Sequence, residues 1–225
     1  MKTHVSLMII ILAFAGVESG HGQSMMRMYR YTYSIAGFFQ SSHSSADMDQ
    51  GSGGVRIGGE TEREVLQFST RNGFFVLRHL AIGGEFAWEH RSESYQPDPN
   101  PVNFRSRDYA NRLFVGPWAR WYIPASMRWY TALELSIGYV RQNEENEEST
   151  SVYVLPKTTS TGNGVGINAG LGMGYLLSRG MVLDLTARYG AGWLDGAVRV
   201  PGNPDRDLQW DYGELHFLLG LQLLI

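Results

Sequence analysis

The chain has 225 residues, which suits one domain, and its 22 acidic and 19 basic side chains nearly cancel. A net charge of −3 gives no basic surface for nucleic acid, and the absence of cysteine excludes a small disulfide-stapled scaffold. An aromatic content of 12% and 27 glycines favour a β-protein instead.

The N-terminus has the pattern of a secretory signal peptide. Lys2 supplies a basic start, residues 5–17 form an apolar core, and small residues suited to cleavage follow. This core is short for a membrane-spanning helix, which needs about 20 residues. We therefore predict a signal peptide at 1–22 and one domain at 23–225, with an uncleaved anchor as the alternative. No later apolar run is long enough to span as a helix, so a membrane protein here must be a β-barrel.

Alternating apolar and polar residues predict eight strands. The first strand stands alone, and three longer segments follow, each with two strands around the hairpin-sized connectors LRH, PAS and LSRG. A last strand ends the chain. In order, these segments are 28–40, 65–90, 112–141, 164–193 and 208–225.

The segments between them are long and polar, at 41–62, 91–108, 142–163 and 194–207. Short and long connections alternate strictly, so all short turns lie at one end of the sheet. Outer-membrane barrels have this asymmetry, with short periplasmic turns and long extracellular loops. An even number of strands then places both termini on the short-turn side.

The two faces of each strand differ in a way that favours lipid outside. In 72–90, Phe74, Ile82 and Trp88 share an apolar face, whereas Gly83 and Glu85 share the other. A soluble, lipocalin-like barrel would bury the first set and expose the second. However, the second set is rich in glycine, which suits a crowded lumen, and the first has almost no charge. An Arg or Lys that faces mid-bilayer costs ~2–4 kcal/mol.

Aromatic residues on the apolar face are predicted to form two girdles. The girdle near the short turns contains Phe74, Trp121, Trp129 and Tyr175, and the girdle toward the long loops contains Trp88, Tyr139, Tyr189 and Trp193. An apolar stretch such as 80–88 spans roughly 20 Å along the membrane normal, near the ~25 Å band of such barrels. The predicted fold is all-β: an eight-stranded antiparallel up-and-down transmembrane β-barrel with three short periplasmic turns and four long extracellular loops.

Three hairpin sequences carry a family resemblance: FSTRNGFFVLRHLAIGGEFAW, VGPWARWYIPASMRWYTALELSIGY and GINAGLGMGYLLSRGMVLDLTARYG. They resemble outer-membrane barrels similar to OmpA and OmpX, in particular the small barrels common in Bacteroidota-like bacteria, over the whole mature chain. The resemblance implies a Gram-negative outer membrane, with lipid, lipopolysaccharide and the barrel-assembly machinery as partners. One departure is the terminus, because many such proteins end in Phe and this chain ends in Ile225.

Charged side chains on the inward face are predicted to form a network in the lumen. Eight strands enclose a space that side chains just fill, and charges confined there must be paired or hydrated. A closed plug is the main prediction, and a narrow gated pore is the alternative. The predicted members are Arg71, Glu85, Arg120, Glu134, Asp184, Arg188 and Glu214.

No catalytic, metal or cofactor site is predicted. Glu214 and His216 both point inward, but no inward serine lies at their depth. His90 and Ser92 form an H-x-S pair at the extracellular rim, similar to the pair of lipid A deacylase barrels. A lipid-modifying enzyme is therefore the second alternative to a non-enzymatic protein.

Two polar loops are candidates for contact with the outside. QNEENEESTS is predicted to be a solvated acidic loop, with a divalent-cation site as the alternative. YQPDPNPVNF contains three prolines, which stiffen an exposed segment. We therefore predict an envelope structural role, or binding of an unknown extracellular ligand through the loops.

Overall fold

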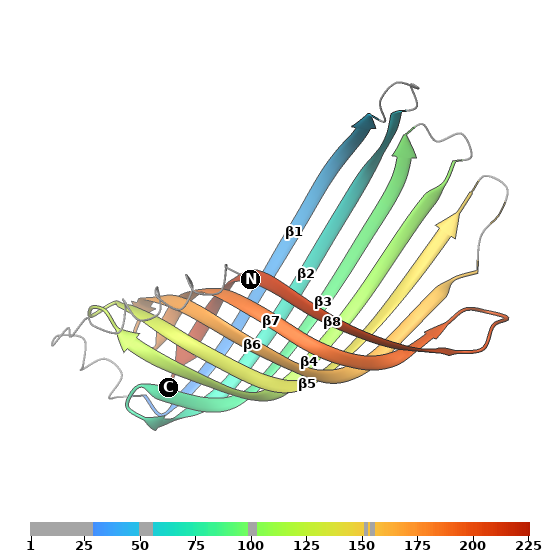
Figure 1. The fold of residues 1–225 in the computed structure, drawn as a ribbon. Coiled ribbons are helices and arrows are strands. Elements are labelled where there is room, and N and C mark those ends of the chain that lie inside the picture. The colour runs from blue at the N-terminus through green and yellow to red at the C-terminus, as the bar shows by residue number, and fades with distance from the viewer. Residues whose placement is uncertain (1–28, 50–55, 99–102, 151–152, 154–155) are drawn as a thin grey trace.

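The structure is a computed structural model that describes residues 29–49, 56–98, 103–150, 153 and 156–225 (Figure 1). The predicted signal peptide at 1–22 lies outside the described residues and stays a prediction. Among the described residues, no helix is long and apolar enough to cross a membrane.

Eight antiparallel strands close into a barrel in which each strand pairs with its neighbours in sequence, and β1 pairs with β8. This confirms the predicted fold class. The strands are β1 (Tyr31–Asp49), β2 (Arg56–Leu77), β3 (Leu80–Asp98), β4 (Arg105–Pro124), β5 (Trp129–Ser149), β6 (Thr158–Ser178), β7 (Met181–Arg199) and β8 (Arg206–Leu224).

The three short connections lie where the alternation predicts them. Arg78 and His79 join β2 to β3, and residues 125–128 join β4 to β5. In the latter, the Ser126 hydroxyl accepts hydrogen bonds from the backbone N–H groups of Arg128 and Trp129. The connection from β6 to β7 uses Gly180 at φ +81°, a conformation that other residues rarely adopt.

At the other end, the strands continue far into the segments that the sequence predicts to be loops. Strands of 19 to 22 residues greatly exceed the ~9–11 that cross a bilayer. Charged residues such as those of 142–149 are rare in strands, so the sequence reads as loop. Cross-strand pairing compensates, because the β4–β5 ladder continues to Arg105 and Ser149.

The distribution of side chains is inverted relative to a soluble protein. Arg71 and Arg120 are inside and only 1% and 0% exposed, whereas Leu135 is outside and 56% exposed. The predicted girdle residues Trp121, Trp129, Tyr139, Tyr189 and Trp193 are likewise exposed on the outer face. An apolar outer belt around a charged interior is the arrangement of a transmembrane barrel.

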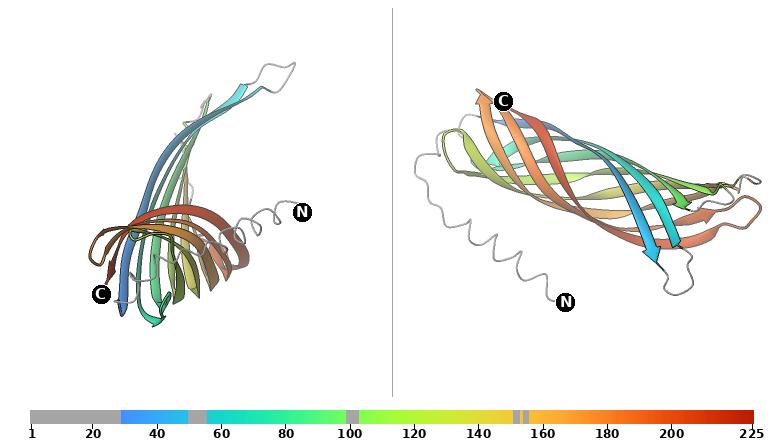
Figure 2. Two further views of the ribbon diagram at one scale, coloured as in Figure 1. Left: turned by 90° about the vertical axis from the view of Figure 1, so that its left-hand side faces the viewer. Right: turned by 90° about the horizontal axis from the view of Figure 1, so that it is seen from above.

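The closure between β1 and β8 is much shorter than the other ladders. It extends only from the pair Thr32–Leu224 to the pair Gly37–Leu219, whereas β1 pairs with β2 along its whole length. Beyond that point, the β1–β2 hairpin diverges from the β7–β8 hairpin (Figures 1 and 2). The molecule is therefore a closed barrel near the termini and a splayed sheet at the far end.

Candidate functional site: a charged lumen

Six charged side chains form one continuous ion-pair chain across the closed part of the lumen. Its order is Arg188, Glu85, Arg71, Glu134, Arg120 and Asp184, contributed by β7, β3, β2, β5, β4 and again β7. All six side chains are buried. Three cations alternate with three anions, so the formal charge of this ion-pair chain is zero.

The contacts within the ion-pair chain are short. Arg71 Nε and Nη1 lie 3.0 Å and 2.9 Å from Glu85 Oε1 and Glu134 Oε2. Arg120 Nη1 lies 3.5 Å from the same Glu134 oxygen, and its Nη1 and Nη2 donate to both Asp184 oxygens at 2.8 Å and 2.6 Å. Such buried groups tolerate desolvation only when their partners are in place.

Arg188, at the end of the ion-pair chain, contacts its carboxylate with poorer geometry than Arg71 and Arg120 do. Its Nη1 lies 2.6 Å from Glu85 Oε1, but without hydrogen-bond geometry, so this contact is an ion pair only. The second oxygen of Glu85 accepts a hydrogen bond from the Ser136 hydroxyl at 2.6 Å. Glu85 is thus held by groups from three other strands.

A layer of buried aromatic and amide groups lies across the lumen below the ion-pair chain, toward the short turns. Tyr130 donates to Gln222 Oε1 at 2.6 Å, and Gln222 Nε2 donates to Tyr122 and Thr32. The Arg120 guanidinium lies 5.3 Å and 5.8 Å from the Tyr122 and Tyr130 ring centres. None of the residues of this layer is among the predicted lumen residues, although the alternation that turns Arg120 inward also turns Tyr122 inward.

Glycines of β6 make room for this packing. Gly170, Gly172 and Gly174 face the lumen, and a Cβ on each would meet Glu134, Arg120 and Tyr130 respectively. The inward glycines of β6 thus provide the space that large side chains on β4 and β5 occupy.

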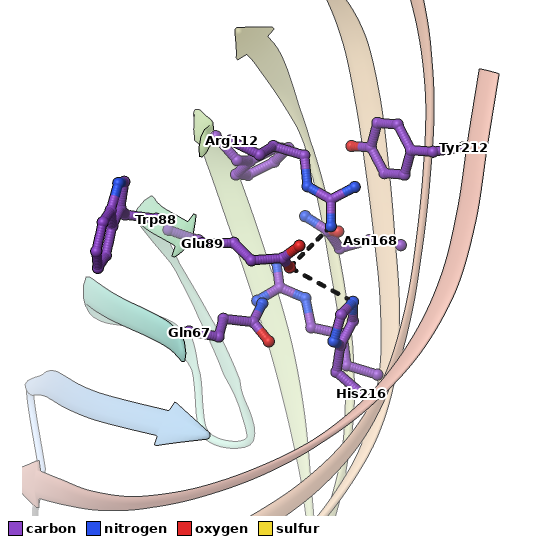
Figure 3. Close-up of a pocket in the computed structure, with 11 residues that line it drawn as sticks. Gln67, Trp88, Glu89, Arg112, Asn168, Tyr212 and His216 are labelled. Atoms are coloured by element: carbon purple, nitrogen blue, oxygen red, sulfur yellow. Dashed lines mark hydrogen bonds and ion pairs between the residues drawn. The ribbon is translucent and has the colours of Figure 1, made fainter. Parts of the chain in front are cut away.

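A second group of charges, the upper cluster, lies farther from the short turns, and its members Glu89, Arg112 and His216 are drawn in Figure 3. Arg112 Nη2 donates to Glu89 Oε2 at 2.8 Å and also to Glu214, and His216 Nε2 lies 3.3 Å from Glu214 Oε2. Arg91 Nη1 lies 3.3 Å from Glu214 Oε1, and Arg91 Nη2 lies 3.9 Å from Glu144. The members are Glu89, Arg91, Arg112, Glu144, Glu214 and His216.

The seven predicted lumen residues therefore do not form one network. Six lie in the ion-pair chain, whereas Glu214 lies in the upper cluster, and among the described residues no ion pair joins the two groups. Arg112 is inward in the alternation but is missing from the predicted set. Side-chain length and strand stagger decide which inward charges meet, and alternation alone carries neither.

Between the two groups lies a small cavity of about 30 Å³, whose lining includes the polar side chains of Gln67, Glu89, Arg112, Asn168, Arg188, Tyr212 and His216. Gln67 Oε1 is buried and has no hydrogen-bond partner in the described part of the chain. A water molecule needs roughly 10–15 Å³ of such volume, so the cavity matches about two waters. It is far too small for a substrate.

Glu89, Glu214 and His216 offer ligand atoms within 4.8 Å of one another, a spacing that a metal ion could use. However, Arg112 hydrogen-bonds to both carboxylates and already supplies the cation between them. A metal would have to displace this guanidinium.

His90 and Ser92 lie on the outer face of β3, as the alternation indicates. His90 Nδ1 is 2.9 Å from the Asn111 amide oxygen, and its ring stacks on Trp88 with centroids 6.1 Å apart. The ring nitrogen that an orienting acid would hold is therefore paired with an amide.

The acidic segment predicted as a loop forms the end of β5 instead. Glu145 and Glu147 face Lys157 on its outer side, with Nζ 2.6 Å and 3.2 Å from their carboxylates. Hydrogen bonds to Glu145 and Glu147 raise the pKa of Lys157. These two glutamates thus already have a cation of the chain itself. Most of the proline-containing segment lies outside the described residues.

A search of protein-family models and of curated proteins finds no match to this chain. Solved structures with a similar fold include OprG from Pseudomonas aeruginosa, at 10% identity and TM-score 0.49, over 90% of this chain and 99% of that one. Ail of Yersinia pestis is similar at 13% identity and TM-score 0.39, over 88% and 100%. The translocator domain of the autotransporter NalP from Neisseria meningitidis is similar at 10% identity and TM-score 0.42, over 98% and 95%. At these identities the likeness concerns the fold alone.

Proposed function

We propose that this chain is a non-enzymatic integral outer-membrane protein that does not conduct and that serves the envelope or binds a partner at the cell surface. The observation that carries the proposal is the buried, charge-neutral ion-pair chain across the lumen. Together with the aromatic layer beneath it, the ion-pair chain fills the closed part of the lumen with buried side chains, which supports a barrel that does not conduct.

The surface available for binding is the part of the strands beyond the membrane. There, β1–β2, β3–β4, β5–β6 and β7–β8 form long hydrogen-bonded hairpins, and the segments between their strands are the loops of this proposal. Loops on such rigid scaffolds commonly carry recognition. The outer membrane, lipopolysaccharide and the barrel-assembly machinery remain part of the proposal, supported by the predicted signal peptide and the resemblance to OmpA- and OmpX-like barrels.

Planar-bilayer recording of the purified barrel tests this function. We expect no conductance steps in potassium chloride, and none after Arg112→Gln, because that change leaves the ion-pair chain intact. Conductance steps in the unaltered protein would favour the narrow pore. Lipid A mass spectrometry with and without the gene tests the lipid-modifying alternative, and an unchanged spectrum is expected.

Orientation is tested separately with inserted tags. Tags near Thr150 and Asn203 should be labelled on intact cells, whereas a tag at Ala125 should be labelled only after the outer membrane is opened. Labelling at Ala125 alone would reverse the orientation and would contradict surface binding through the long-connection end.

A further inference from the structure

The seam between β1 and β8 opens inside the apolar belt. The first residues beyond the shared ladder still turn large apolar side chains outward, with Phe39 66% and Phe217 57% exposed. Leu215, the next outward residue of β8, is also exposed. The free strand edges therefore begin at membrane depth, on the side of the long connections.

Free backbone groups at that depth need partners. In hydrocarbon, each unsatisfied N–H or C=O group costs several kcal/mol, which is why membrane barrels normally close completely. A hydrocarbon chain alone offers neither donors nor acceptors. Whatever occupies this seam must combine apolar contacts for Phe39 and Phe217 with polar groups for the strand edges.

The upper cluster lies directly behind the seam. Glu214 and His216 lie on the first part of β8 that no longer pairs with β1. They lie next to the last buried position, Leu218, on the inner face of the strand. On the other side, Phe38 of β1 pairs with Gln67, and Gln67 pairs with Glu89. The cavity with the unpartnered Gln67 oxygen is lined by Gln67 and His216, so it lies close to the strands on both sides of the seam.

We propose that the β1–β8 seam is a lateral binding site for an outer-leaflet amphiphile with a zwitterionic head group, whose head reaches the upper cluster while its chains stay in the bilayer. The inference rests on the proposed function only in placing the barrel in the outer membrane. It adds a ligand class and a route of entry from the lipid side.

The charges at the seam select the head group. Arg91 and Glu214 are the partly exposed pair in the upper cluster, with side chains 26% and 22% exposed, and Glu144 is more exposed still. One partly exposed cation thus lies between two partly exposed carboxylates. An ammonium group matches the carboxylates and a phosphate group matches Arg91. The same two groups donate to free carbonyls and accept from free N–H groups on the strand edges.

Cysteine cross-linking across the seam tests the proposal, because the chain contains no cysteine of its own. Continuing the observed β1–β8 register would place Phe39 opposite Phe217, so the test variant is Phe39→Cys with Phe217→Cys. The matched control is Ile35→Cys with Leu221→Cys, which are direct partners on the same outer face. Both variants leave the upper cluster unchanged. Oxidation is measured in phosphatidylethanolamine vesicles and in phosphatidylglycerol vesicles.

The control pair should form an intramolecular disulfide in both vesicles, which also shows that the barrel has inserted and closed. The Phe39–Phe217 pair should cross-link several-fold less in phosphatidylethanolamine than in phosphatidylglycerol, because the zwitterionic lipid holds the seam open. If the Phe39–Phe217 pair cross-links as much as the control pair in both vesicles, β1 and β8 pair directly with each other and no lipid lies between them. Equally low yields in both would remove the head-group selectivity, and a disulfide-linked dimer would identify a second copy as the occupant. Each of these three results overturns the proposal.

A readout that does not depend on disulfides follows the head group directly. A fluorophore on Gln40→Cys, inward and exposed at the β1 edge, should be quenched by phosphatidylcholine with a spin label on its head group. Absence of quenching at Gln40→Cys contradicts entry through the seam.

Discussion

The ion-pair chain and the upper cluster are built from the same residue types but differ in their surroundings. Every member of the ion-pair chain is buried, and the strands around it are paired on both sides. The upper cluster holds three carboxylates, two arginines and a histidine. It lies beside the seam, where β1 and β8 no longer pair with each other. Closure of the wall thus decides whether a set of lumen charges acts as a plug or is available to a ligand.

The largest expected effect breaks the ion-pair chain. Arg120→Gln leaves Asp184 buried with its main partner removed, and breaking a buried pair in this way costs ~3–5 kcal/mol. Arg91→Gln in the upper cluster should cost clearly less, because Glu214 keeps Arg112 and Glu144 is partly exposed. Urea unfolding of both variants in lipid vesicles measures the difference. Equal losses would remove the distinction between the two groups of charges.

A double-mutant cycle sharpens this result within the ion-pair chain. Arg120 and Glu134 are direct cross-strand partners, with Nη1 and Oε2 3.5 Å apart. The free energy lost by Arg120→Gln with Glu134→Gln should be less than the sum of the single losses, with a coupling of roughly 0.5–3 kcal/mol. Additive losses would show that the two groups do not interact.

The next effect compares two depths on the lipid-facing side of β5. Leu135→Arg places a charge near mid-bilayer, where the cost is ~2–4 kcal/mol, whereas Tyr139→Arg lies at the girdle, where the cost falls to ~0–1 kcal/mol. Heat-modifiable gel mobility and urea unfolding report both. Ser136 is a poor control, because its buried hydroxyl donates to Glu85 and an Arg there would collide with the ion-pair chain. A stable Leu135→Arg barrel would contradict the register of β5.

A smaller effect concerns the space that glycines provide. A Cβ at Gly174 would meet the Tyr130 ring, so Gly174→Ala should destabilise by ~1–3 kcal/mol through overpacking. At Gly84 a Cβ meets nothing within 4 Å, so Gly84→Ala should be neutral or slightly stabilising. The two variants add the same atom, one on the inner face of β6 and one on the outer face of β3, and thermal unfolding compares them. Equal stability of both would mean that the aromatic layer yields freely.

Sequence alternation suffices for the strand number, the short turns and the faces, because a bilayer imposes a strict period of two on every strand. Strand ends such as Glu144–Ser149 are missed, since charged residues in water satisfy a ladder as well as a loop. Alternation also does not predict how the lumen charges divide between the ion-pair chain and the upper cluster. Glu214 and Glu134 have the same inward direction, and only the stagger of the strands sends one to Arg112 and the other to Arg71. Likewise, nothing in the alternation of β1 and β8 indicates that their shared ladder stops at Gly37.

The smallest expected effect lies outside the membrane, where Arg199 Nη2 is 3.0 Å from Asp205 Oδ2 next to the last long connection. A hydrogen bond from Arg199 holds the pKa of Asp205 below its usual value. A carboxyl group with a depressed folded-state pKa stabilises the fold above its unfolded-state pKa of about 4, and this contribution is lost as the pH falls through the lower, folded-state value. Because the pair is fully exposed, solvent screens it, and the pH dependence of unfolding should change little in Arg199→Gln.

An NMR titration should instead show the Asp205 pKa rising toward its usual value in that variant. An unchanged titration would mean that the ion pair does not persist in solution. A large loss of stability would mean that charges beyond the membrane hold the splayed hairpins together, as the ion-pair chain holds the closed barrel.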